Sequence, residues 1–120
     1  MSGMRCALLA VLSGVLCGLL ASQAPAADGA VPALLVQKRC NACHDLKSKV
    51  IGPPYLAIAL RHAPRREVMV EVLARKILLG GGGSWGVVPM VPNDSVTPQQ
   101  ARAMAEWILS LAPAAARAAR

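Results

Sequence analysis

Residues 40–44 read Cys40-Asn41-Ala42-Cys43-His44, and this stretch decides the fold of the chain. It has the form C-x-x-C-H, which is typical of c-type haem attachment. Each thiol can add to one of two vinyl groups on neighbouring pyrroles, and two intervening residues let a tight helical turn reach both. His44 can then direct its imidazole to the iron from one face. The motif therefore predicts one covalent haem c, attached at Cys40 and Cys43, with His44 as an iron ligand.

The first 27 residues have the order of a secretory signal peptide, with a short basic start, an apolar stretch and small residues. The apolar run, residues 7–20, is about 14 residues long, whereas a membrane-spanning helix needs about 20. This length disfavours the alternative of an uncleaved membrane anchor. Residues 24–26 read Ala-Pro-Ala and fit the cleavage rule. We expect export to the periplasm, cleavage near Ala26 or Ala27, and no membrane association of the mature chain.

Signal cleavage also decides which cysteines remain. Cys6 and Cys17 lie within the predicted signal peptide, so the mature chain keeps only Cys40 and Cys43. A disulfide framework is therefore excluded, although an exported protein could have one. A zinc site needs four ligands, and outside the motif the mature chain adds only the distant His62. A thioredoxin-like cysteine pair belongs to a βαβ unit, which the sequence does not indicate.

The mature chain has the length of one small domain. We expect this domain to cover residues 28–113, followed by a flexible C-terminal tail over 114–120 whose simple composition favours fraying. The whole chain has two Trp, one Tyr and no Phe. A small domain has a marginal core to begin with, so a large apolar cofactor would help to complete it.

Hydrophobic spacing predicts an all-α protein with four helices and no strand. The fourth helix opens with Thr97 as its cap and Pro98 at its first helical position. Residues 84–95 are rich in Pro, Gly, Asn and Asp and are predicted to form a loop. The four predicted helices cover residues 32–39, 55–61, 64–79 and 98–111.

A haem iron that carries electrons generally has a second axial ligand, and the mature chain offers four candidates. Met69 and Met104 fall on apolar helix faces, where core packing is expected. His62 lies just before a proline at a helix junction, where solvent exposure is expected. Met90 lies in the proline-flanked sequence 88–92, and the prolines restrict the loop that holds it. Met90 is the predicted ligand, and the alternative is a buried methionine that only fills space.

The sequence resembles the short bacterial class I cytochromes c, which are periplasmic single-haem electron carriers. The resemblance extends over about residues 34–111. It implies a small class I cytochrome c fold, with about four helices wrapped around one covalently bound haem c. The matching pieces, in order, are Cys40-Asn-Ala-Cys-His44, Val50-Ile-Gly-Pro-Pro-Tyr55, Lys76-Ile77, Trp85-Gly86, Pro89-Met90-Val-Pro-Asn93 and Ala105-Glu-Trp107-Ile-Leu.

The resemblance also implies residue roles at the iron. His44 would be the proximal ligand and Met90 the distal one. Pro53 would offer its backbone carbonyl to the free ring nitrogen of His44 and so orient the imidazole. An iron with both axial positions filled has no open site for a substrate, so the resemblance implies one-electron transfer and no enzymatic activity.

Four further residues receive roles from the resemblance. Trp85 and Lys76 would reach a haem propionate. Asn93 would steady the loop that carries Met90. Trp107 would pack where the first and last helices cross.

Three functions are consistent with these observations. The first is a soluble monomer that shuttles electrons between periplasmic donor and acceptor proteins. The second is a dedicated haem c subunit of a periplasmic dehydrogenase complex. The third is a haem enzyme or gas sensor in which Met90 does not bind the iron. The first is the predicted function.

The chain is basic, with a formal net charge of +7. Without the signal peptide, which holds one arginine, 12 Lys and Arg stand against six Asp and Glu, a net charge of +6. An exported chain with this motif is not expected to bind nucleic acid. Five basic residues after the motif would either speed docking with an acidic partner or form an ordinary solvated face: Lys47, Lys49, Arg61, Arg65 and Arg66.

Overall fold

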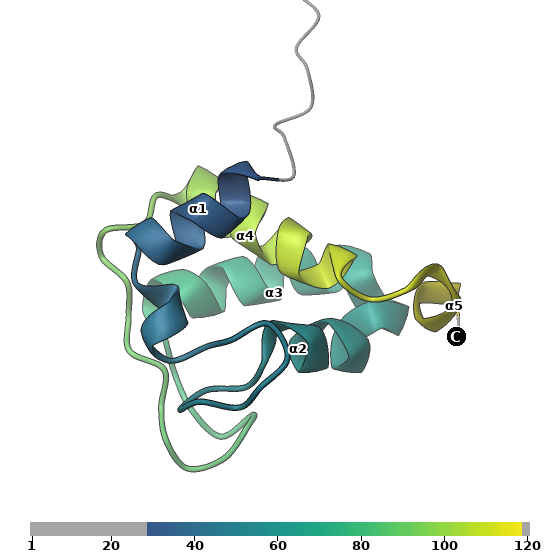
Figure 1. Cartoon of the computed structure of the whole chain (residues 1–120), viewed down its shortest axis with the longest axis horizontal. Coiled ribbons are helices and arrows are strands. Elements are labelled where there is room, and N and C mark those ends of the chain that lie inside the picture. The colour runs from purple at the N-terminus through teal and green to yellow at the C-terminus, as the bar shows by residue number, and fades with distance from the viewer. Residues whose placement is uncertain (1–28, 119–120) are drawn as a thin grey trace, which may run out of the picture.

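The computed structural model describes residues 29–118, and this part of the chain is helical, without a named strand (Figure 1). The all-α prediction is confirmed. The predicted signal peptide over residues 1–27 lies outside the described residues. The elements are α1 (Ala30–Gln37), the 3₁₀ turn η1 (Cys40–Ala42), α2 (Tyr55–His62), the 3₁₀ turn η2 (Ala63–Arg65), α3 (Arg66–Leu79), α4 (Pro98–Ser110) and α5 (Ala114–Ala118).

The four longer helices correspond to the four predicted ones, with local differences at their ends. The first lies two residues earlier than predicted, because Arg39 adopts a left-handed conformation (φ 58°) that ends the helical path before the motif. The third starts at Arg66 and not at Pro64, since the chain first makes the tight turn η2. The fourth begins as predicted. The Thr97 hydroxyl accepts from the Gln100 amide, and the Gln100 side chain accepts from the Thr97 amide, which closes a capping box.

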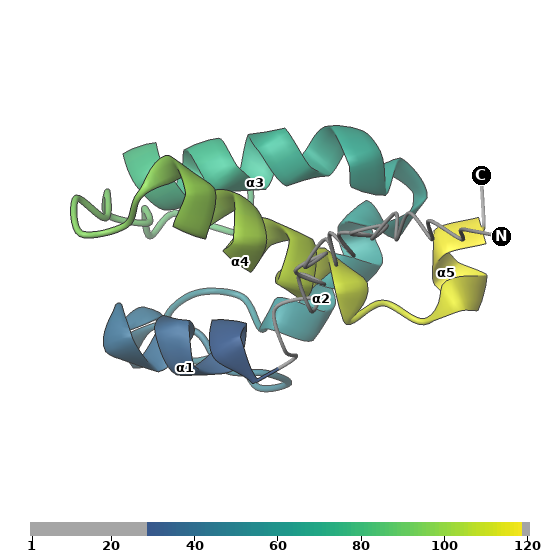
Figure 2. The same ribbon diagram turned by 90° about the horizontal axis from the view of Figure 1, so that it is seen from above.

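Helix α4 is the centre of the core. It packs along α3 and also contacts α2 and α1 (Figures 1 and 2). Its inward face includes Ala101, Met104, Ala105 and Leu109, all without solvent exposure. The alanines have small side chains, so they let neighbouring helices approach closely, while Met104 and Leu109 fill the space between them. The predicted core positions of Met69 and Met104 are confirmed.

The C-terminal segment, for which the sequence predicts a flexible tail, contains a further short helix. Residues 114–118 form α5, which packs against η2. Ala59, Ala63 and Ala112 form a small buried cluster there, with Ala116 against it. The Arg117 guanidinium donates to the carbonyls of residues 110 and 112 and so caps the turn between α4 and α5.

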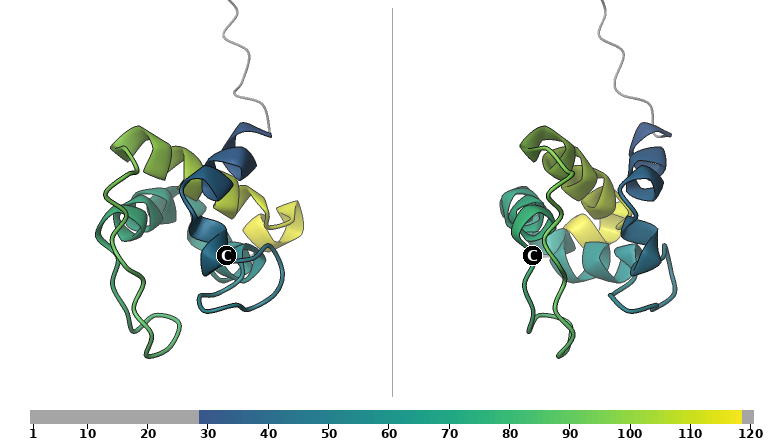
Figure 3. Two further views of the ribbon diagram at one scale, coloured as in Figure 1. Left: turned by 60° about the vertical axis from the view of Figure 1, so that its left-hand side comes forward. Right: turned by 90° about the vertical axis from the view of Figure 1, so that its left-hand side faces the viewer.

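Two long loops leave the helical body on the same side (Figure 3). One follows the cysteine motif and leads into α2, and the other joins α3 to α4. We call residues 43–54 the His44 wall and residues 80–93 the Met90 wall, because a cavity lies between them. No helix within residues 29–118 combines the length and apolar character needed to cross a membrane.

Candidate haem site

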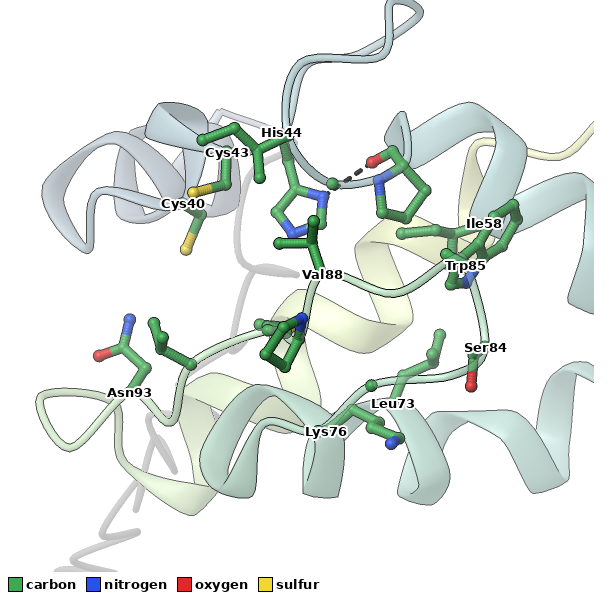
Figure 4. Close-up of a pocket in the computed structure, with 18 of the residues that line it drawn as sticks. Cys40, Cys43, His44, Ile58, Leu73, Lys76, Ser84, Trp85, Val88 and Asn93 are labelled. Atoms are coloured by element: carbon green, nitrogen blue, oxygen red, sulfur yellow. Dashed lines mark hydrogen bonds between the residues drawn. The ribbon is translucent and has the colours of Figure 1, made fainter.

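A cavity of about 310 Å³ lies between the two walls and is floored by α2 and α3. In Figure 4, Cys40, Cys43 and His44 lie along one side, and Lys76 and Asn93 lie along the other. All eight residues that the sequence singled out as site residues line this one cavity: Cys40, Cys43, His44, Pro53, Lys76, Trp85, Met90 and Asn93.

The cysteines are presented by the short turn η1. Arg39, in its left-handed conformation, redirects the chain out of α1 and into this turn. Such a conformation costs a residue with a Cβ about 1 kcal/mol. Cys40 and Cys43 are free thiols, both half-buried. Burial raises the pKa of the Cys40 thiol, so it is protonated at neutral pH. Two accessible thiols on one turn fit addition to two neighbouring vinyl groups.

His44 is held in a single orientation. Its Nδ1 lies 2.7 Å from the carbonyl oxygen of Pro53 (dashed in Figure 4). A carbonyl can only accept, so Nδ1 carries the proton, and the lone pair of Nε2 is free to bind a metal. Tyr55 stacks on the imidazole with ring centroids 5.5 Å apart. Gly52 leaves the ring its space, because a Cβ at Gly52 would lie 2.5 Å from His44 Cε1.

The His44 wall is tied down by its own backbone. The amides of Ile51 and Gly52 both donate to the carbonyl of Cys43, at 3.2 and 2.8 Å. Farther along, the amides of Tyr55 and Leu56 donate back to residues 45 and 46, at 2.9 and 3.0 Å. These bonds close the loop on the cysteine motif and do not depend on which side chains it carries.

Two methionines line the cavity, and their surroundings differ. Met69 on α3 is 7% exposed and belongs to the main core. Met90 is half-buried and lies in the loop, where its backbone exchanges two hydrogen bonds with Gly81, at 2.9 and 3.0 Å. Met104 is fully buried and does not line the cavity.

Asn93 fastens the end of the Met90 wall. Its Nδ2 donates to the carbonyl of Lys38 at 3.2 Å, across 55 residues of sequence. Its Oδ1 accepts from the amide and the hydroxyl of Ser95. The Lys38 ammonium donates to the carbonyl of Ser95. The loop that carries Met90 is thereby joined to the end of α1, next to the cysteine motif.

The lining of the cavity fits a haem. It is mainly apolar, with Ile58, Val72 and Leu73 among its residues. Among the described residues that line it, four are Lys or Arg and none is Asp or Glu. An apolar cavity with a cationic margin suits a flat apolar macrocycle that carries two carboxylates. The four cations are Lys38, Arg39, Arg61 and Lys76.

The expectation that His62 is exposed to solvent is wrong. His62 is half-buried in the cavity lining, and its Nδ1 is buried with no hydrogen-bond partner. Burial, followed by the charges of Arg61 and Arg65, lowers the pKa of this imidazole below its ordinary value. The residue occupies the last position of α2 and precedes the 3₁₀ turn η2.

Two residues contribute to the site in ways that the sequence analysis did not predict. Tyr55 stacks on His44 and meets Trp107 edge-on, at 6.0 Å between ring centroids. Burial raises the pKa of Tyr55, so it stays neutral. Arg61 lies over the Trp85 ring. Tyr55 lies two residues after Pro53, within a piece that matches the class I cytochromes c, so the sequence held a signal for it. No spacing rule connects Arg61 with Trp85.

A zinc site is the alternative that the sequence disfavours at the cysteine motif. Within residues 29–118, no three His, Cys, Asp or Glu side chains form a group that could hold a metal ion. His62 belongs to the cavity lining but joins no such cluster with the motif.

Comparison with known proteins gives a consistent result. A family model described as Cytochrome c matches residues 29–112. Cytochrome c-552 of Hydrogenobacter thermophilus is 50% identical over 78 residues, which cover 65% of this chain and 78% of that protein. Cytochrome c-551 of Stutzerimonas stutzeri is 43% identical over 95 residues, which cover 78% of this chain and 88% of that protein.

A solved structure has the same fold. The crystal structure of wild-type Nitrosomonas europaea cytochrome c552 matches with a TM-score of 0.65 and 40% sequence identity. The match covers 68% of this chain and 99% of that one. The region of likeness therefore spans nearly the whole of a small protein.

Proposed function

Because this chain belongs to the cytochrome c family, whose members carry covalent haem c and transfer electrons, we propose that it is a periplasmic carrier of single electrons with a His44/Met90-ligated iron. Membership makes the chain a mono-haem electron-transfer protein rather than an enzyme. The proposal adds the ligands, the location and the partners.

One observation carries the ligand assignment. The two thiols of the motif, a histidine with a free Nε2, and a loop methionine line one cavity. Cys40 and Cys43 would form the thioether bonds, and Pro53 would keep the His44 imidazole in the tautomer that a metal needs. Met90 is favoured over Met69 because Met69 is 7% exposed within the main core, whereas Met90 is half-buried in a loop that lines the same cavity as His44.

The chain's residues would then serve electron transfer by position and charge. When bound, the haem supplies an iron that gains or loses one electron, and a thioether ligand favours the reduced form. His44 and Met90 would fill both axial positions and leave no site for a substrate. Trp85 and Lys76, on the cavity margin, would hold a propionate, and Asn93 would hold the Met90 wall in place.

The charge of the cavity margin and the size of the domain indicate what kind of partner the protein would meet. The cavity margin carries four cations, so an acidic surface on the donor or acceptor would dock there favourably. The matched region equals nearly the whole length of a solved cytochrome, which supports a free monomeric carrier. Gel filtration of the protein from its native host would separate a free carrier from a subunit of a dehydrogenase complex.

The ligand assignment is tested with Met90→Ala and, as the matched control, Met69→Leu. Oxidised wild-type protein should show a sulfur-to-iron charge-transfer band. Met90→Ala should abolish the band completely and lower the midpoint potential, because the thioether no longer favours ferrous iron. Met69→Leu should keep the band. Loss of the band in Met69→Leu with its survival in Met90→Ala would reverse the assignment.

A further inference from the structure

The segment between α3 and Met90 has little structure of its own. Residues 81–89, which we call the glycine-rich loop, are all exposed to solvent. Gly81, Gly83 and Gly86 have positive φ values, so the backbone follows a path that other residues rarely adopt. The loop carries Trp85 and ends at the proposed ligand Met90. Its position therefore decides where both residues lie.

Few hydrogen bonds hold the glycine-rich loop. The pair between Gly81 and Met90 and the bond from the Gly83 amide to the Gly86 carbonyl (3.3 Å) lie within the hairpin that the loop itself forms. Among the described residues, one hydrogen bond joins residues 82–88 to the rest of the protein. The Arg61 Nη1 donates it to the carbonyl of Ser84 at 2.7 Å.

Arg61 makes a second contact with the same loop. Its guanidinium carbon lies 4.7 Å from the centroid of the Trp85 ring, in cation–π geometry. Arg61 lies near the end of α2, the helix that follows the His44 wall. The helix is anchored there by Ala59, which has no solvent exposure. One side chain thus spans from a fixed helix to the loop across the margin of the cavity, where Trp85 and Ser84 lie together (Figure 4).

We propose that Arg61 is a positioning residue that latches the glycine-rich loop over the cavity and slows the release of Met90. The inference rests on the proposed function, in which Met90 is an iron ligand. A backbone rich in glycine gains much freedom when it is released, so the two Arg61 contacts suppress an opening that the loop would otherwise favour. Arg61 acts through Trp85 and Ser84 and need not touch the iron.

The test uses the oxidised haem-loaded protein and imidazole, a neutral ligand that can bind the iron only after Met90 leaves. Arg61→Gln keeps much of the side-chain length but removes the guanidinium. Imidazole should bind it about tenfold faster than wild type, because a hydrogen bond and an exposed cation–π contact each contribute a few-fold to the closed state. Arg61→Lys keeps the charge and should give an intermediate rate.

The matched control is Arg65→Gln, which removes the same charge four residues away, from an exposed side chain on η2. It should bind imidazole at the wild-type rate. Equal rates in Arg61→Gln and wild type would overturn the proposal. So would equal acceleration in Arg61→Gln and Arg65→Gln, because the cause would then be net charge.

Amide hydrogen exchange tests the Arg61 latch independently of whether Met90 binds the iron. The amides of Gly81, Gly83 and Met90 are hydrogen-bonded within the hairpin. They should exchange several-fold faster in Arg61→Gln than in Arg65→Gln or wild type. If the wild type lacks the sulfur-to-iron band, Met90 ligation fails, yet this exchange difference still decides whether Arg61 latches the loop. Unchanged exchange would overturn the latch whatever the ligand.

Discussion

The two walls of the cavity are built in different ways. Backbone hydrogen bonds close the His44 wall, two of them on the Cys43 carbonyl, and the His44 ring is packed against Tyr55. The Met90 wall has backbone bonds at its two ends and within its own hairpin, but residues 82–88 are joined to the rest of the described protein by Arg61 alone, and the Asn93 side chain ties the far end to Lys38.

Because the two walls are held differently, they should respond differently to side-chain substitutions. Backbone bonds persist when a side chain is replaced, whereas a latch made by one side chain is lost with it. Substitutions should therefore alter the Met90 wall more readily than the His44 wall. Local opening is easiest where few buried contacts and few hydrogen bonds hold the chain.

The largest effect is expected when the haem is no longer attached, because both walls then lose the group that would lie between them. Cys40→Ala with Cys43→Ala removes covalent attachment, and the cavity of about 310 Å³ then stays unfilled in a small domain. The mature double variant should lack a cooperative unfolding transition in circular dichroism. Asn41→Ala, an exposed change in the same turn, is the control and should fold. A folded, haem-free double variant would show that the helices alone support both walls.

Replacing Gly80 should damage the Met90 wall specifically. Gly80 has φ 68°, and a Cβ there would lie 2.3 Å from the Met90 carbonyl oxygen and 2.8 Å from the Pro92 nitrogen. Gly80→Ala should destabilise the protein by about 2–3 kcal/mol, because it adds backbone strain to a steric clash. The sulfur-to-iron band should weaken or disappear, as measured in the oxidised protein alongside urea unfolding.

Gly52→Ala is the matching change on the His44 wall. The three atoms nearest to the new Cβ would all belong to the His44 ring, and the φ of Gly52 is not in the left-handed region. The methyl group would displace the His44 ring from its position against Pro53 and Tyr55, so we expect a loss of about 1–2 kcal/mol and a shifted midpoint potential, with the sulfur-to-iron band retained. If both alanine variants lost the band equally, the two walls would not be independent.

The smallest effect concerns His62 and pH. Burial lowers its pKa below 6.5, so the unfolded chain binds this proton more tightly than the folded one. The stability that neutral His62 contributes is complete above pH 6.5, declines as the pH falls below that value, and is lost once the pH is below the lowered pKa of the folded state. His62→Gln should therefore flatten the decline in unfolding free energy between about pH 7 and pH 5. Urea unfolding of both proteins across that range checks this, and parallel curves would contradict it.

Much of the fold and site could be predicted from particular residues. The spacing of Cys40, Cys43 and His44, the cap at Thr97 and Pro98, and the core position of Met104 all rest on rules that act within a few residues. The likeness to class I cytochromes c then joined Pro53 and Met90 to the motif, and the structure places both in the cavity lining.

Three details of the structure were not predicted. His62 lies in the cavity lining at the end of α2, and residues 114–118 form a helix that packs against η2, a contact between segments about 50 residues apart. Helix α1 ended early because Arg39 accepted a left-handed conformation that its side chain does not favour. Contacts between distant segments and the backbone conformation of a single residue are not visible in the hydrophobic pattern of one sequence.

The sequence by itself determined the covalent chemistry and the helices, because thioether spacing, capping and hydrophobic periodicity depend on neighbours along the chain. Only the tertiary structure decided how the two walls are held. Arg61 reaches Ser84 across 23 residues and Asn93 reaches Lys38 across 55, and such pairs are selected by the packing of whole helices. The motif specifies that a haem is attached, while these distant contacts specify how firmly the cavity closes on it.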